Sequence, residues 1–80
     1  MKLHFVGKDP DSPSGGCPAV FVDESSGDLL FQGLTVTEAG ALSFVDSKSA
    51  MQPGESVVRL PARMRAIILE ACGVDERADV

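Results

Sequence analysis

The sequence predicts an α+β fold in which a small antiparallel sheet of three to four strands packs against a C-terminal helix. Three patterns lead to this fold class. Apolar and polar residues alternate at the N-terminus, two apolar runs flank a segment of turn-forming residues, and apolar residues recur every three to four positions after Pro61. A chain of 80 residues is expected to form one domain over residues 1–80.

The first strand is expected over residues 2–6, where Leu3 and Phe5 alternate with polar neighbours. Prolines, serines and glycines then fill residues 7–16, which offer little to pack. This segment is expected to be a flexible loop.

A hairpin is expected next. Residues 19–22 are apolar on both faces, as in a central strand, and residues 23–28 have the composition of a turn. Residues 29–36 form the partner strand, and Gly33 in its middle predicts a kink.

A short helix is favoured over a strand for residues 37–45. Thr37 suits the N-cap, although Gly40 weakens the helix by about 1 kcal/mol relative to alanine. Residues 46–55 then read as a polar linker with a Pro-Gly turn, and residues 56–60 as a fourth strand.

The clearest helix covers residues 61–72. Pro61 suits its first position and Gly73 its left-handed cap, so residues 74–80 are expected to be a frayed tail. One apolar stripe follows the helical spacing: Met64, Ile67, Ile68, Ala71 and Cys72. The expected core consists of Leu3, Phe5, Val20, Val22, Leu30, Leu34, Val58, Met64, Ile67 and Ile68.

Composition narrows the function classes. The chain has 12 acidic and 7 basic residues, a net charge of -5, which disfavours direct nucleic-acid binding. The longest apolar runs have four residues, Ala19–Val22 and Ala66–Leu69, far short of the about 20 needed to span a membrane. The N-terminus also lacks the apolar core of a signal peptide, so a cytoplasmic location is expected.

No metal or cofactor site is expected. The acidic segment from Asp9 lacks the glycine and the final acid of a calcium loop. The soft ligands His4, Cys17 and Cys72 lack the paired spacing of a zinc site. The two cysteines are expected to be buried or inert, a bridge between them being possible but unsupported, and a thiol-dependent enzyme or redox protein that uses Cys17 with His4 is the alternative.

The arginines are unevenly placed. Residues 56–71 contain three arginines, Arg59, Arg63 and Arg65, but one acid. The last two fall in the first turns of the final helix, where the macrodipole favours acids. Either acidic side chains of the chain itself compensate them, or they bind an acidic partner, or Arg63 and the helix start bind a small anion.

Leu69 lies off the apolar stripe, beside Arg65 on the helical wheel. It is either covered by residues 37–45 or exposed for protein association. The candidate partner-binding residues are therefore Arg59, Arg63, Arg65 and Leu69.

Two segments carry a family resemblance. Residues 14–17, Ser-Gly-Gly-Cys, lead into the apolar strand at residues 19–22, and residues 46–48 read Asp-Ser-Lys. The chain resembles a family of small acidic actinobacterial proteins of unknown biochemical function, encoded beside helix-turn-helix regulators. The resemblance implies action with such a regulator, in some cases as an antitoxin.

The expected function is thus a non-enzymatic protein-interaction module. It would bind a transcriptional regulator through the arginine surface, and its acidic segments would compete for the regulator's basic surface. A homodimer is also favoured, because a small chain barely offsets about 1.5 kcal/mol of ordering entropy per residue.

Overall fold

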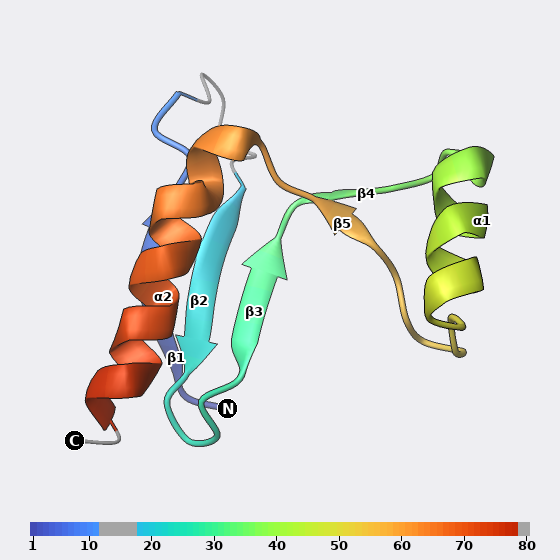
Figure 1. Cartoon of the computed structure of the whole chain (residues 1–80). Coiled ribbons are helices and arrows are strands. Elements are labelled where there is room, and N and C mark those ends of the chain that lie inside the picture. The colour runs from blue at the N-terminus through green and yellow to red at the C-terminus, as the bar shows by residue number, and fades with distance from the viewer. Residues whose placement is uncertain (12–17, 79–80) are drawn as a thin grey trace.

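A three-stranded antiparallel sheet and one long helix form the body of the protein (Figure 1). The computed structural model describes residues 1–11 and 18–78. In chain order the elements are β1 (Leu3–Lys8), β2 (Ala19–Asp23), β3 (Leu29–Gln32), β4 (Leu34–Thr35), α1 (Ala39–Lys48), β5 (Val58–Arg59), the 3-10 turn η1 (Ala62–Met64) and α2 (Arg65–Ala78). The α+β class is confirmed.

The strand order in the main sheet is β1-β2-β3, and the short strands β4 and β5 form a separate two-stranded sheet. The expected hairpin joins β2 to β3. Its turn is closed by Asp23, whose carboxylate accepts hydrogen bonds from the Ser25 amide at 2.9 Å and the Ser26 hydroxyl at 3.1 Å. Gly27 takes a positive φ of 81°, which glycine adopts without strain.

At Gly33, where a kink is expected, the chain passes from the main sheet to the two-stranded sheet. The chain leaves β3 at this glycine, and the next two residues pair with β5. A Cβ at position 33 would lie 2.7 Å from the carbonyl oxygen of Arg59. Glycine is therefore required here because two backbones approach closely.

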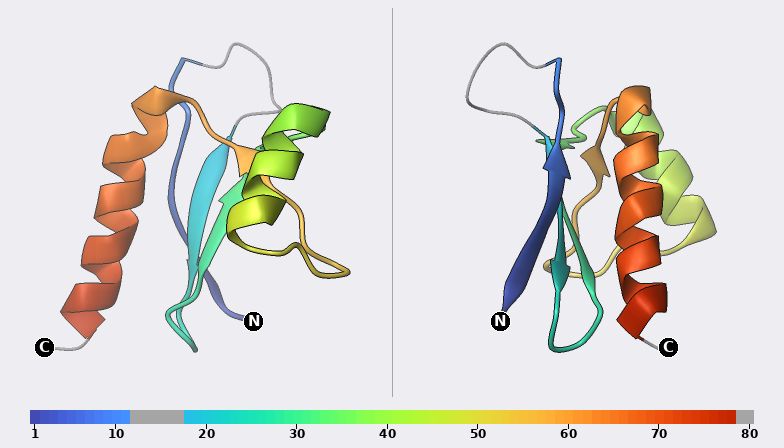
Figure 2. Two further views of the ribbon diagram at one scale, coloured as in Figure 1. Left: turned by 45° about the vertical axis from the view of Figure 1, so that its right-hand side comes forward. Right: turned by 90° about the vertical axis from the view of Figure 1, so that its left-hand side faces the viewer.

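The core lies between α2 and one face of the main sheet (Figure 2). The buried apolar residues of this cluster are Val20, Val22, Met64 and Ala71, with Val6, Leu60, Ile67 and Ile68 packed around them. The helical stripe expected after Pro61 thus meets the central strand, except that Cys72 is exposed.

Leu3 and Phe5 were expected in this core, and that prediction is wrong. Phe5 pairs with Phe21, so both rings lie on the face opposite α2, with their centroids 5.5 Å apart. A bulge between Phe5 and Gly7 then changes the alternation, so that Val6 packs against the core and Gly7 lies against Ile67. β1 carries apolar residues on both faces, and the period-two pattern cannot select between them.

Leu34 and Val58, also expected in the core, are exposed. They belong to the two-stranded sheet β4–β5, which leads away from the body to α1 (Figure 1). The helix expected over residues 37–45 is present, but it runs to Lys48 and its N-cap is Glu38 rather than Thr37. The Pro-Gly turn in the following linker is confirmed, since Gly54 has a φ of 88°.

Both ends of the expected final helix differ. Residues 62–64 form a 3-10 turn, and α2 continues through Gly73 to Ala78, so the tail expected from residue 74 is helical up to Ala78. A helix passes one glycine at a cost of about 1 kcal/mol, and the glutamate, arginine and alanine that follow favour continuation.

The loop expected over residues 7–16 also begins later. Gly7 and Lys8 extend β1, and Asp9 is buried. Residues 12–16 lie outside the described residues.

Replacing Gly33 with alanine tests the close approach. The added methyl group would meet the Arg59 carbonyl oxygen at 2.7 Å and a Leu60 methyl group at 2.8 Å. We expect Gly33→Ala to destabilise the protein by about 1–3 kcal/mol and to lower its melting temperature by several degrees. Circular dichroism during thermal unfolding measures this shift.

Gly40→Ala is the matched control. The nearest atom to its added Cβ is a Glu38 carboxylate oxygen at 3.6 Å, an ordinary contact, and alanine favours the helix. This variant should melt no lower than the natural protein. Equal melting temperatures for Gly33→Ala and the natural protein would contradict the requirement for glycine at position 33.

Candidate functional site

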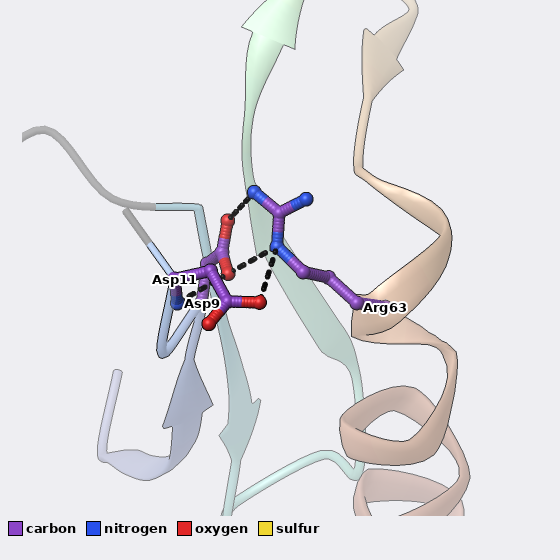
Figure 3. A network of polar contacts seen from close by, with 3 residues as sticks. All are labelled: Asp9, Asp11 and Arg63. Carbon is purple, nitrogen blue, oxygen red and sulfur yellow. Dashed lines mark hydrogen bonds and ion pairs between the residues drawn. The ribbon is translucent and has the colours of Figure 1, made fainter. Parts of the chain in front are cut away.

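The arginines expected to bind a partner occupy three different environments. Arg63 lies in η1 at the start of the helical segment, where its guanidinium points to the end of β1 (Figure 3). Its Nε donates to Oδ1 of Asp9 at 2.6 Å and its Nη2 donates to Oδ2 at 2.5 Å. Asp11 lies at 3.7 Å from the same Nε. Of the interpretations left open by the sequence, the structure shows an internal ion pair for Arg63.

Hydrogen bonds to backbone groups hold Asp9 in position for this contact. Its amide donates to the Pro18 carbonyl at 2.9 Å, which fixes the end of β1 beside the start of β2. Its Oδ1 also accepts from the amide of Asp11 at 3.0 Å. The side chain is only 1% exposed, whereas that of Arg63 is half-exposed. A buried carboxylate needs such a partner, because an unpaired buried charge is costly.

The ion pair shifts the pKa values of both Asp9 and Arg63. The hydrogen bonds from Arg63 lower the pKa of Asp9 below its usual value, although burial acts in the opposite direction. The same contact raises the pKa of Arg63. The pair is therefore fully charged at neutral pH and resists protonation until the solution is strongly acidic.

Arg65 and Leu69 lie together on the outer side of α2. They are one helical turn apart and both are exposed, Leu69 by 72%. The sequence left open whether residues 37–45 cover Leu69. α1 lies far from α2 beyond the β3 edge of the sheet, so Leu69 is uncovered (Figure 1).

Arg59 lies on the second sheet, in β5, where it pairs with Leu34. Within the described part of the chain, neither Arg59 nor Arg65 forms an ion pair. Arg65 is thus an uncompensated cation in the first turn of α2, where the helix dipole already places positive charge.

The remaining candidate sites are the anion site at the helix start and the thiol site of the cysteines with His4. At the helix start, the carboxylate of Asp9 already binds the Arg63 guanidinium, which one of the three interpretations assigned to a small anion. Cys72 is exposed and free, so it is neither buried nor bridged, and the expectation that its thiol is inert stays a prediction. His4 is exposed on β1, and Cys17 lies outside the described residues, so their proposed pairing stays a prediction.

Among residues 1–11 and 18–78, no three histidine, cysteine, aspartate or glutamate side chains lie together as a metal site would require. In the same residues no helix has the length and apolar character needed to cross a membrane.

The residue that sequence reasoning missed is Asp9. It was considered as a calcium ligand and as part of a loop, whereas it is the buried partner of Arg63. The available signal was the unfavourable position of Arg63, which required an acid from elsewhere in the chain. Nothing in the sequence indicated which of the 12 acids it would be.

No family model, no curated protein and no solved structure matches this chain.

Asp9→Asn should destabilise the protein, and the loss should depend on pH. The folded-state pKa of Asp9 lies below its unfolded value of about 3.9, so the charged pair stabilises the fold fully above that value. This contribution is lost as the pH falls through the lowered pKa. We therefore expect Asp9→Asn to melt several degrees below the natural protein at pH 7. The two melting temperatures should converge as the pH falls to 2, and thermal unfolding across this range measures the difference.

Asp11→Asn is the matched control, because Asp11 is exposed and 3.7 Å from Arg63. Exposed ion pairs of this kind contribute about 0–1 kcal/mol. The melting temperature of Asp11→Asn should stay close to that of the natural protein at every pH from 7 to 2. A constant gap between Asp9→Asn and the natural protein at every pH would contradict the assigned role of the carboxylate.

Proposed function

We propose that this protein is a non-enzymatic interaction module that binds and modulates another protein in the cytoplasm. The supporting observation is the exposed pair Arg65 and Leu69 on the outer side of α2. Arginine is enriched at protein interfaces, and the fully buried centre of an interface is more apolar than the rest of the surface. An uncompensated arginine beside an exposed leucine fits an acidic partner surface with an apolar centre.

Arg63 has a different role in this proposal from the one its sequence position suggested. Because its guanidinium is committed to Asp9, it stabilises the start of the helical segment instead of supplying free charge. Arg59 and Arg65 form no ion pair with the described side chains, and Arg63 holds the start of the helical segment in place. A substitution of Arg63 would therefore report on folding more than on binding.

The first candidate for the partner is a helix-turn-helix transcriptional regulator. The support is the resemblance to small acidic proteins encoded beside such regulators. The net charge of -5 agrees with this proposal, since acidic segments can compete with DNA for a basic surface. In this proposal the chain itself makes no contact with nucleic acid.

The test begins with affinity purification of the tagged full chain from its native cells, followed by mass spectrometry. We expect a helix-turn-helix protein to be recovered in stoichiometric amount. Isothermal titration calorimetry with that purified regulator then compares the natural chain with the double variant Arg65→Glu, Leu69→Glu. Its affinity should fall at least tenfold, because the charge is reversed and an apolar contact is lost.

Glu70→Gln provides the control on the same helix. Glu70 is exposed but lies about 100° around α2 from Leu69, so this change should leave the affinity unchanged. Circular dichroism verifies that each variant is folded. Equal affinities for the natural chain and the double variant would remove Arg65 and Leu69 from the interface, and recovery of no regulator would reject the proposed partner class.

A further inference from the structure

The segment of residues 34–59, called the arm below, has little core of its own. It consists of β4, α1, β5 and their connections, and it extends from the body beyond β3 (Figure 1). None of the residues of α1 is buried. Phe44 is 65% exposed and Leu34 is 78% exposed. A 10-residue helix and a ribbon of two-residue strands are each marginal in water, so the arm needs a surface to pack against.

α1 is amphipathic. On the helical wheel its apolar residues share one side, Ala41, Leu42, Phe44 and Val45, while Ser43 and Ser47 lie on the other. The ammonium group of Lys48 lies over the ring of Phe44, 5.6 Å from its centroid. The apolar side is therefore suited to a second apolar surface.

The main sheet provides such a surface. α2 packs on β1 and β2 on one face of it, and no described helix or strand covers the other face, which we call the open face (Figure 2). The strand register places four large apolar side chains there: Leu3, Phe5, Phe21 and Leu30. Phe5 is 54% exposed.

The exposed area of the chain indicates that these surfaces become covered. A compact monomer of 8.4 kDa is expected to expose about 4,600 Å². This chain exposes 5914 Å². The excess of about 1,300 Å² is larger than the about 800 Å² that each partner contributes to a standard stable interface. The radius of gyration, 14.2 Å, likewise exceeds the about 12 Å expected for 80 residues.

Neither surface is sufficient alone. The three strands contain 15 residues, of which about half face this side. A standard stable interface contains about 20–30 residues on each side. The arm must therefore take part in the same interface.

The arm does not reach the open face of its own chain. α1 lies beyond the β3 edge and on the side of the sheet that carries α2, as the two views of Figure 2 show. In a pair of chains, by contrast, each chain has one arm and one open face, so every arm has an open face of the other chain available to it.

We propose that two copies of this chain form a dimer by exchanging arms, with the apolar side of α1 of each copy packed on the open face of the other. Two-fold symmetry gives two identical contacts, and each chain contributes one arm and one open face. This inference goes beyond the proposed function, since Arg65 and Leu69 on the outer side of α2 take no part in the exchange.

Analytical ultracentrifugation of the full chain over a range of concentrations tests the dimer. We expect a mass of about twice 8.4 kDa for the natural chain. Phe44→Glu in the arm and Phe5→Glu on the open face should each raise the dissociation constant at least 100-fold, because each substitution occurs twice in the dimer. Ser43→Glu, on the polar side of α1, should leave the dissociation constant unchanged.

Mixing the two monomeric variants tests the exchange itself. In a mixed dimer, the intact arm of the Phe5→Glu chain meets the intact open face of the Phe44→Glu chain, so one of the two contacts is restored. We expect the mixture to form dimers although neither variant does so alone. If arms paired with arms, or faces with faces, every mixed dimer would contain a damaged contact and the mixture would stay monomeric.

Leu3→Glu repeats the open-face test at a second site, should Phe5→Glu unfold by circular dichroism. A natural chain that is monomeric at every concentration, or a mixture that fails to dimerise, overturns the proposal. The double variant Arg65→Glu, Leu69→Glu should still dimerise. Loss of regulator binding and loss of dimerisation are thereby separate results, and each proposal can fail without the other.

Discussion

The ion pair between Asp9 and Arg63 is the constraint on which the body of this protein depends. It joins residues 54 positions apart, connecting the end of the first strand to the start of the C-terminal helical segment. The carboxylate is buried, so its charge must be matched, and the paired guanidinium fixes where the helical segment begins. Met64 follows directly and is fully buried. The apolar stripe of α2 then lies over Val20 and Val22 of the central strand.

The same arrangement leaves much of the chain uncovered. One helix packs on one face of the three-stranded sheet, and no described helix or strand forms a second layer on the other face. The segment that would have supplied it, residues 34–59, is directed outward because Gly33 allows the chain to leave β3 and pair with β5. The proposed exchange of arms would cover this remaining apolar surface.

Local patterns predicted most of the elements. The alternation around Phe5, the turn chemistry around Gly27 and the helical spacing after Pro61 each depend on neighbouring residues, and each produced the expected element. The wrong predictions concern positions at which two local conformations have similar energies. Gly73 was read as a helix cap, but a helix can pass a glycine at a cost of about 1 kcal/mol. The first strand has apolar residues on both faces, and only its bulge and its pairing with β2 determine which face meets the helix.

The sequence by itself determined the fold class, the central strand and hairpin, a kink at Gly33 and the uneven placement of three arginines in an acidic chain. These features follow from residue types and short spacings. Tertiary structure decided that Asp9 neutralises Arg63, that Leu69 is uncovered, and that Phe5 and Phe44 face outward. The physical reason is that such pairings join residues far apart in the chain, where distance and burial determine the energy and sequence spacing carries no information about either.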